Sequence, residues 1–474
     1  MLYILNKRFQ LRGWDKLPFA LCDTVTGFTM FMRKEDFMLI CHCDGKHDIN
    51  EEELTERGRE ILKEGISKKI ITPCPEGGRL EKHQEYHKYD SRYIKSAQWS
   101  ITGKCNFRCR HCFMSAPHAK LGELSYEECL RIIEEMGKCG IRSVSLTGGE
   151  PLIRKDFFDI VDELIRHNII VESIYSNGKL VTDDFLDKLE ERGLKPTIHM
   201  SFDGVGWHDW LRGIEGAEKM VTDAYRRCQE RNFDTTCEMC VHKNNIGSFR
   251  ETMLLLSELG CRSLKVNAAA PMGEWTKTSS EFTLSLKETY DVFLDYIRIF
   301  YEEGMPINLW LGGFFKCDRG ETGYRIGNCK YAEGYDCSQK SVCGHARNSL
   351  YISPEGYALP CMTIANTKMK EDFPNILRTD LSDILTDSTY MSLIDLRLED
   401  YLAHNEKCQN CEFKNRCGAG CRGVAIGETG SDYLMPDEEV CFFFHSGYDK
   451  KVREVADEAA AKAKQKQNSV CEKP

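Results

Sequence analysis

Cys105-Asn-Phe-Arg-Cys109-Arg-His-Cys112 is the most informative stretch of this 474-residue sequence. Thiolates spaced this closely on one loop can converge on a metal cluster. Three thiolates would leave one iron of a cubane cluster without a protein ligand, much as a catalytic zinc keeps one position open for substrate. A zinc loop that borrows a fourth ligand, such as His111, is the alternative interpretation.

The cysteine loop lies between a strand-like run and a helical pattern, and this alternation repeats about every 30–40 residues along the chain. The helical pattern begins at Ser125, where Glu128 completes a capping box, and stops at Gly140. Thr182 and Gly193 bracket another helix. Such units predict a parallel sheet with outer helices, in an open doubly wound sheet or a partial barrel, with ligands at the carboxyl ends of the strands. Strands are expected at residues 96–101, 143–146, 169–175, 197–202, 235–241 and 263–266.

Short polar motifs end the next three expected strands. These are Gly148-Gly149-Glu150-Pro151, Ser176-Asn177-Gly178 and Ser201-Phe-Asp203-Gly204, and His208-Asp209 and Arg212 follow. Glycines let a backbone approach a ligand closely, and a carboxylate pairs with an ammonium group. Each motif alone is a common turn, but their order at successive strand ends indicates one ligand site.

Together with the cysteine loop, these motifs resemble those of the radical S-adenosylmethionine (SAM) superfamily. The resemblance implies an α/β fold with a partial (β/α)6 barrel of the TIM type over residues 96–305. It also implies that the open iron of a [4Fe–4S] cluster chelates SAM, and that one electron cleaves SAM to methionine and a 5′-deoxyadenosyl radical that abstracts hydrogen from substrate. The implied cluster ligands are Cys105, Cys109 and Cys112, and the implied SAM contacts are Gly148, Gly149, Glu150, Ser176, Asn177, Ser201, Asp203, Arg212 and His111.

The alternation of strands and helices ends after about residue 317, where Cys and Gly become frequent. Such a segment can bury little hydrophobic core, so metal clusters are expected to stabilise it. The spacing Cys343-x12-Gly356-x4-Cys361, Cys408-x2-Cys411-x5-Cys417-x3-Cys421 and Cys441 is similar to that of the SPASM domain, assigned to residues 306–448. This resemblance implies two more [4Fe–4S] clusters, three in all. The first would use Cys337, Cys343, Cys361 and Cys421, and the second Cys408, Cys411, Cys417 and Cys441.

Two alternatives stay open in this cysteine-rich block. Cys329 is a rival for Cys337, and if neither binds, the first auxiliary cluster keeps an open iron that could take a substrate thiolate. A structural zinc knot is the alternative for residues 408–421 taken alone.

The N-terminal residues 1–75 have the element order of a β-hairpin followed by a winged helix. They resemble the RiPP recognition element, a winged-helix module that adds the leader of a ribosomally made peptide to its sheet edge. A structural cap on the barrel is the alternative. Residues 76–95 are expected to be a linker, and residues 449–474 a surface helix with a frayed end.

Composition narrows the functional class. A net charge of −10 argues against a nucleic-acid surface, and no apolar run approaches the roughly 20 residues that cross a bilayer. The 24 cysteines favour metal or redox chemistry in a reducing compartment over a disulfide scaffold, because no secretory signal is evident. We therefore expect a cytoplasmic protein that binds neither membrane nor nucleic acid.

The combined resemblance implies a peptide maturase that forms thioether crosslinks from substrate Cys, as sactipeptide and ranthipeptide synthases do. Its partners would be a precursor peptide with a leader and an electron donor such as flavodoxin or ferredoxin. Carbon–carbon crosslinking and epimerisation remain open alternatives. A maturase of the anaerobic sulfatase type is a further alternative, but Met362 follows Cys361 where those enzymes typically have an Asp that acts as base, which counts against it. A non-enzymatic iron–sulfur electron carrier is the hypothesis from another class. The sequence assigns no catalytic acid or base.

Overall fold

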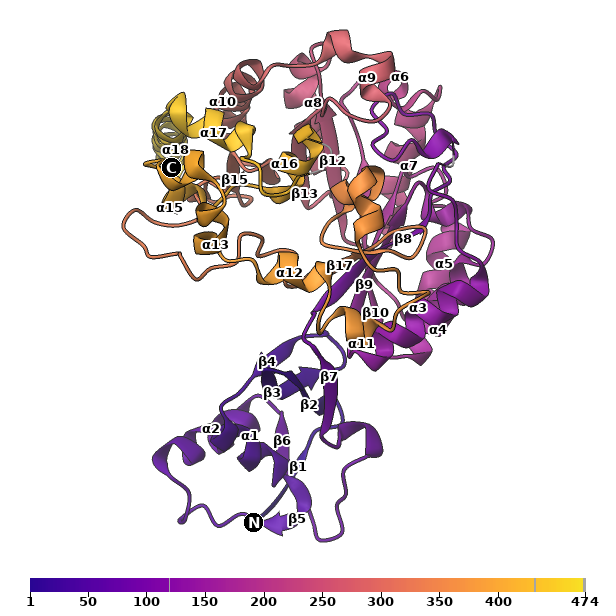
Figure 1. Ribbon diagram of the computed structural model, residues 1–474, viewed down its shortest axis with the longest axis vertical. Coiled ribbons are helices and arrows are strands. Elements are labelled where there is room, and N and C mark those ends of the chain that lie inside the picture. The colour runs from indigo at the N-terminus through magenta and orange to yellow at the C-terminus, as the bar shows by residue number, and fades with distance from the viewer. Residues whose placement is uncertain (119, 430–431, 472–474) are drawn as a thin grey trace.

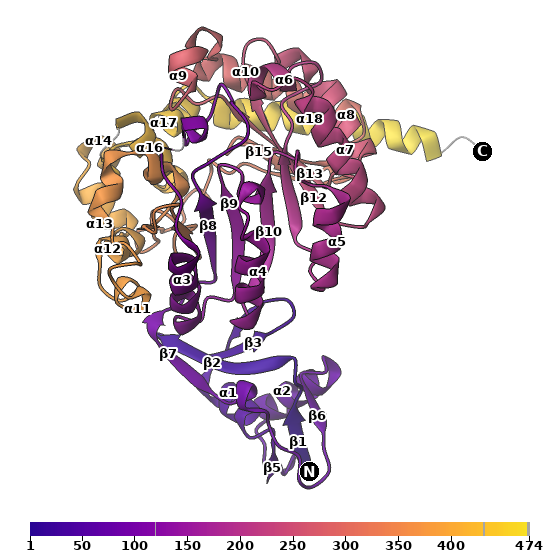
Figure 2. The ribbon, with the colours of Figure 1, turned by 90° about the vertical axis from the view of Figure 1, so that its right-hand side faces the viewer.

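The computed structural model describes residues 1–118, 120–429 and 432–471. Its central element is a curved sheet of eleven strands with helices on its outer face (Figures 1 and 2). Seven consecutive strands are parallel, which confirms the predicted α/β partial barrel. They are β8 (Ser96–Thr102), β9 (Ser143–Gly148), β10 (Ile170–Ser176), β11 (Thr197–Ser201), β12 (Thr235–Val241), β13 (Ser263–Ala268) and β14 (Asn308–Leu311).

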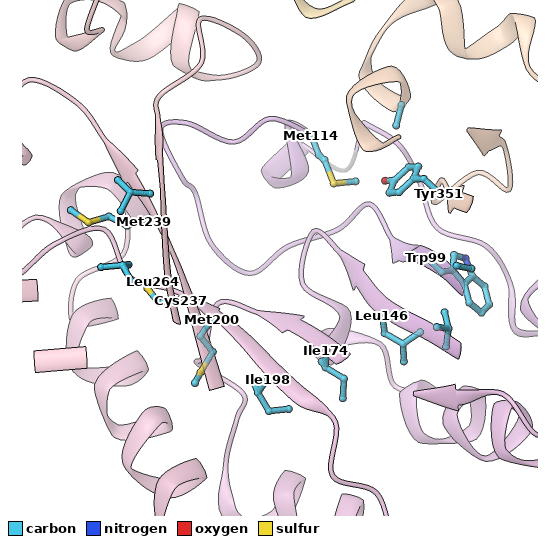
Figure 3. Close-up of a cluster of buried hydrophobic side chains, with 14 of the residues drawn as sticks. Trp99, Met114, Leu146, Ile174, Ile198, Met200, Cys237, Met239, Leu264 and Tyr351 are labelled. Carbon is cyan, nitrogen blue, oxygen red and sulfur yellow. The ribbon is translucent and has the colours of Figure 1, made fainter. Parts of the chain in front are cut away.

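The outer helices form where the sequence places caps and amphipathic spacing. Ser125 and Glu128 make the expected capping box at the start of α3, and Thr182 caps α5. Apolar side chains of successive strands gather on one face of the sheet, among them Ile174, Ile198 and Leu264 (Figure 3). The helices are α3 (Tyr126–Lys138), α4 (Phe157–Arg166), α5 (Asp183–Glu191), α6 (His208–Arg212), α7 (Ala217–Glu230), α8 (Phe249–Glu258), α9 (Trp275–Thr278) and α10 (Leu286–Glu302).

Strands from the cysteine-rich block extend this sheet at both ends. At one end β17 (Ser349–Ile352) pairs in parallel with β8, and β18 (Ala358–Leu359) follows it. At the other end β15 (Phe315–Cys317) and β16 (Tyr324–Arg325) continue from β14. The expected boundary between residues 305 and 306 therefore divides segments that share one sheet.

The rest of the cysteine-rich block consists of short helices and turns. A long last helix, α18 (Tyr448–Cys471), packs on α10 with Val452 and Ala456 fully buried, so its first half is more than a surface helix. None of the helices in the described part of the chain combines the length and apolar character needed to cross a bilayer. The short helices are η6 (Met362–Asn366), η7 (Lys368–Asp372), α11 (Leu381–Ile384), α12 (Thr389–Asp395), α13 (Leu398–Ala403), α14 (Glu406–Gln409), α15 (Lys414–Cys417), α16 (Arg422–Thr429) and α17 (Glu438–His445).

The N-terminal unit contains two small sheets and two helices. One sheet has the order β5-β1-β6 and the other β4-β3-β2-β7, so β4 is an edge strand in the described residues. The elements are β1 (Leu2–Leu5), β2 (Phe9–Asp15), β3 (Leu17–Asp23), β4 (Thr29–Phe31), α1 (Lys34–Cys41), β5 (Asp44–Asp48), α2 (Glu56–Ser67), β6 (Ile71–Pro73) and β7 (His87–Arg92).

The expected linker at residues 76–95 is instead folded into this unit. β7 pairs in parallel with β2, and Gln84 is buried with its amide donating to the Leu5 and Asn6 carbonyls. The linker prediction was wrong because it rested on polarity, whereas here polar side chains satisfy buried backbone groups.

The N-terminal unit is fixed to the barrel by specific polar contacts. The Trp14 indole donates to the Cys139 carbonyl at 2.9 Å, and the Arg142 guanidinium donates to Gln10 at 2.7 Å. Arg92 forms a bidentate pair with Asp395, at 3.0 and 3.1 Å. The first two contacts join β2 to the barrel, and the third joins β7 to α12 of the cysteine-rich block.

Candidate active site

A cavity of about 250 Å³ opens at the carboxyl ends of the central strands. The cysteine loop, the glycine pair after β9 and a side chain of the C-terminal block, Met362, meet there. The structure thus brings together most of the residues predicted to hold the cluster and SAM. Those that line the cavity are Cys105, Cys109, Cys112, His111, Gly148, Gly149, Ser176, Asn177, Ser201 and Arg212.

The three thiols of the cysteine loop are held by backbone amides. The Phe107 amide donates to Cys105 Sγ at 3.4 Å, and the Ala116 amide donates to Cys112 Sγ at 3.3 Å. Burial raises the pKa of Cys105 to about 12, so that a nearby positive charge is needed to keep it as a thiolate. Arg212 Nη1 lies 3.8 Å from Cys109 Sγ. Amide donors and a guanidinium beside three thiols fit an iron–sulfur cluster.

No group of three His, Cys, Asp or Glu side chains in the described residues converges closely enough to hold one metal ion. The three cysteines nevertheless line one cavity together with His111. His111 is half-buried and lines the cavity, and its buried Nδ1 has no hydrogen-bond partner among the described residues.

The glycine pair after β9 lets this strand end touch the cysteine loop. A Cβ added at Gly149 would lie 2.1 Å from the Lys104 carbonyl oxygen, and one at Gly148 2.4 Å from the Thr102 oxygen. The Gly149 amide donates to the Thr102 carbonyl at 2.8 Å and the Glu150 amide to the Lys104 carbonyl at 2.9 Å. The backbone, not a side chain, forms this wall of the cavity.

Glu150 lies directly behind the lining instead of facing the cavity. Its carboxylate accepts from the Asn177 amide at 2.7 Å, the Ser176 hydroxyl at 3.1 Å and the Leu152 amide at 3.2 Å. Burial outweighs these bonds and raises the pKa of Glu150 to about 7. Asn177 in turn donates to Asn106 at 2.8 Å, so Glu150 orients the residues that border the cysteine loop.

Asp203 is likewise fully buried behind the cavity. It accepts two bonds from the Arg212 guanidinium, at 2.6 and 3.1 Å, and lies 3.1 Å from His208 Nδ1. Burial alone would raise its pKa, but Arg212 and His208 hold the pKa of Asp203 far below its ordinary value. In this structure Asp203 positions Arg212 beside Cys109, while Ser201 lines the cavity.

Sequence reasoning missed three cavity residues on the inner face of the strands. Tyr175 stacks on His199 with ring centroids 4.2 Å apart, the Thr236 hydroxyl lies 2.5 Å from His199 Nδ1, and Glu238 lines the cavity beside them. Burial lowers the pKa of His199 to about 4, so its ring is neutral. The available signal was a polar residue at every second position of strands that are otherwise apolar.

The cysteines of the C-terminal block form two groups. Cys361 and Cys421 lie on either side of Gly423, and burial, followed by the charges of the Cys421 and Cys343 thiols, raises the pKa of Cys361 to about 11. A Cβ added at Gly423 would lie 3.4 Å from Cys361 Sγ and 3.6 Å from Cys421 Sγ, so a larger residue there would crowd both.

The second group surrounds its own cavity of about 340 Å³. Four thiols line it, those of Cys408, Cys411, Cys417 and Cys441. The Tyr401 hydroxyl lies 3.3 Å from Cys408 Sγ. Four thiols that line one largely apolar cavity fit an iron–sulfur cluster.

The structure does not bring Cys337 into the first group. Its buried thiol donates to the Asn415 carbonyl at 3.4 Å, and its packing neighbours are Val342 and Tyr401. The rival Cys329 lies 3.8 Å from Arg416 Nη2 instead. In this structure Cys343, Cys361 and Cys421 thus lie apart from Cys337, and the assignment of Cys337 to the first auxiliary cluster stays a prediction.

Comparison with known proteins agrees with this geometry. The model of the radical SAM superfamily matches residues 99–256, and the model of the SPASM iron–sulfur cluster-binding domain matches residues 343–412. An AdoMet-dependent heme synthase of Methanosarcina barkeri is 27% identical over 362 residues, 73% of this chain and 95% of that protein. The sporulation killing factor maturation protein SkfB of Bacillus subtilis is 23% identical over 360 residues, 74% of this chain and 78% of that protein.

Solved structures share the fold. Streptococcus suis SuiB bound to S-adenosylmethionine aligns with a TM-score of 0.63 and 16% identity, over 92% of this chain and 99% of that one. The anSMEcpe structure with bound AdoMet and a peptide aligns with a TM-score of 0.56 and 17% identity, over 77% and 99%. The chain therefore contains a radical SAM domain at residues 99–256 and a C-terminal SPASM domain, as the two family models describe them.

Proposed function

We propose that this protein modifies a ribosomally made peptide. When bound at the cysteine loop, the cluster and SAM supply a 5′-deoxyadenosyl radical that abstracts hydrogen. The chain's own residues hold the thiols, wall the cavity with the Gly148–Gly149 backbone and present Tyr175, His199 and Glu238 to a substrate. The observation that carries the proposal is the N-terminal unit with its free edge strand.

The edge of β4 is suited to bind an extended peptide. The β3–β4 ladder uses the Phe28 carbonyl and the Met32 amide, so in an antiparallel pair the amides of Thr29 and Phe31 point away from β3. Phe28 is 63% exposed and Val25 66% exposed beside this edge. Main-chain pairing plus nearby apolar side chains is the means by which sheet edges capture peptides.

The heme synthase relative raises a competing candidate, a tetrapyrrole substrate. Its alignment spans nearly all of that protein but leaves about a quarter of this chain unmatched, whereas SuiB matches 92% of this chain in fold. SuiB has also been crystallised with its precursor peptide SuiA. The part of this chain that the heme synthase lacks is largely matched in fold by SuiB, which binds a peptide. This match favours a peptide substrate over a tetrapyrrole.

Within peptide chemistry we propose thioether formation from a substrate Cys. Met362 follows Cys361 and is 37% exposed at the cavity, so this position offers no carboxylate base of the sulfatase-maturase kind. The three-thiol group at Cys343, Cys361 and Cys421 leaves room for a substrate sulfur at a cluster there. Each crosslink would replace one S–H and one C–H bond by one S–C bond. The 5′-deoxyadenosyl radical would take the hydrogen atom of the C–H bond, the thiol would release a proton, and the remaining electron would pass to an auxiliary cluster, so the peptide would lose two hydrogens.

The radical function is tested with anaerobically reconstituted full-length protein and a flavodoxin donor. We expect 5′-deoxyadenosine from SAM, its loss in Cys105→Ala, and retention in Cys74→Ala, which removes a half-buried thiol far from the cavity. Iron near twelve per chain is expected if all three sites hold cubanes. Zinc in the loop, or no deoxyadenosine, would refute the assignment.

Peptide capture is tested with short Cys-rich peptides encoded beside this reading frame. Thr29→Pro removes an outward amide without breaking a ladder bond, whereas Thr29→Ala keeps it. We expect weaker peptide binding in Thr29→Pro alone, and a mass loss of two hydrogens per crosslink after turnover. Equal binding by both variants would remove β4 from the proposal.

A further inference from the structure

A row of basic and aromatic side chains continues from the cavity along the inner face of the sheet. Parallel pairing sets Glu238 opposite Lys265 and Lys265 opposite Trp310, and antiparallel pairing sets Trp310 opposite Lys316. Side chains of paired neighbours point to the same side of a sheet. We call Lys265, Trp310 and Lys316 the basic row.

The members of this row touch one another. Lys265 Nζ lies 3.3 Å from Glu238 Oε1 and 5.7 Å from the Trp310 ring centroid, and Lys316 Nζ lies 4.6 Å from the same centroid. The tryptophan is therefore held between two ammonium groups, an arrangement that cation–π attraction stabilises. Glu238 ends the row at the cavity, which it lines.

The basic row is open to solvent and carries excess positive charge. Trp310 is 43% exposed, and the side chains of Lys265 and Glu238 are 37% and 41% exposed. Lys316 forms no ion pair within 4.0 Å in the part of the chain that the structure describes. The basic row, with Lys265 and Lys316 against the single carboxylate of Glu238, is locally positive, whereas the whole chain has a net charge of −10.

We propose that the basic row docks an acidic segment of the peptide substrate beside the residue that is modified. This inference rests on the proposed function in taking the substrate to be a peptide. Carboxylates of the segment would pair with Lys316 and Lys265, and an apolar side chain would pack on Trp310. The Glu238 carboxylate repels acidic residues at the cavity, so the residue that enters it is neutral or basic.

The geometry also limits where the acidic residues lie. From β12 to β15 the row crosses three strand spacings, about 14 Å, which an extended peptide covers with about four residues. Acidic side chains are therefore expected within about four residues of the modified position. A segment further along the peptide would lie beyond Lys316, the last member of the basic row.

The test measures binding of two synthetic probes to the full-length protein at low ionic strength. The probes are fluorescein-labelled peptides of equal length, one alternating Glu and Gly and the other alternating Lys and Gly. We expect the Glu probe to bind more tightly than the Lys probe. Lys316→Glu should weaken binding of the Glu probe by up to about fivefold and Glu238→Gln should strengthen it, since each exposed charge pair is worth up to about a factor of five. Added salt should reduce all three differences.

Lys464→Glu is the matched control, because it makes the same charge change on an exposed part of α18, the helix that projects from the body of the protein (Figure 2). Circular dichroism checks that each variant is folded. Equal weakening by Lys316→Glu and Lys464→Glu, or equal binding of the two probes, would overturn the proposal. Because the assay reads binding alone, its outcome is separate from that of the deoxyadenosine test.

Discussion

Replacing Gly149 by Ala tests whether contact between β9 and the cysteine loop builds the cavity. The added Cβ would lie 2.1 Å from the Lys104 carbonyl oxygen and 2.6 Å from its carbon. Since both contacts involve backbone, no side chain can move aside, and the strand end must separate from the loop by about 1 Å. Overpacking of this kind costs about 1–3 kcal/mol.

The same displacement strains two hydrogen bonds. The Gly149 amide donates to the Thr102 carbonyl and the Glu150 amide to the Lys104 carbonyl. Each is worth about 1 kcal/mol, so the total expected destabilisation is about 3–5 kcal/mol. The separation would also widen the cavity wall next to Cys105, and we expect loss of about four irons per chain and of SAM binding.

The assay compares Gly149→Ala with Gly247→Ala. At Gly247 an added Cβ meets nothing within 4 Å, so that variant should keep wild-type stability and iron content. Both variants are expressed, reconstituted anaerobically, and measured by denaturant unfolding, iron analysis and SAM titration. If Gly149→Ala matched Gly247→Ala in all three, the tight contact would not be needed to build the site.

Three further perturbations have expected outcomes. Because the pKa of Glu150 is about 7 when folded and about 4.3 when unfolded, the metal-free protein should lose about 3 kcal/mol of stability as pH rises between these values, and Glu150→Gln should remove this loss in unfolding curves across that range. Cys361→Ala should remove about four irons per chain. Cys337→Ala should retain them, because the Cys337 thiol is hydrogen-bonded to the Asn415 carbonyl. Equal loss of iron in the two variants would show that Cys337 is a ligand of the first auxiliary cluster. Ala456→Asp should strongly lower the midpoint of thermal unfolding, because it buries an unpaired charge between α18 and α10. Ala461→Asp, on the exposed side of α18, should leave the midpoint unchanged. Similar midpoints for the two variants would show that α18 does not pack on α10 in solution.

The elements that sequence reasoning predicted well are those whose signals are local. The Ser125–Glu128 capping box and the glycines after β9 depend on neighbouring backbone, and each lies where it was expected. The cysteine spacing likewise predicted which thiols border the main cavity, since a short loop keeps them close.

The features that were missed depend on contacts between distant segments. β7 forms only because β2 lies beside it, and nothing in its polar sequence requires a strand. Sequence reasoning also gave no sign of the buried donors of Glu150 and Asp203, the Asn177 amide and the Arg212 guanidinium. The place of Cys337 depends on packing against Tyr401, which lies more than sixty residues later in the chain.

The pairing of β17 with β8 also constrains how the protein is made. About 250 residues separate these partners, so on the ribosome the edge of β8 stays open until most of the chain has been synthesised. Such distant pairing is slow to form and exposes an incomplete sheet to aggregation. Expression at low temperature with slow induction should therefore raise the yield of folded protein more than it does for barrels closed by neighbouring strands.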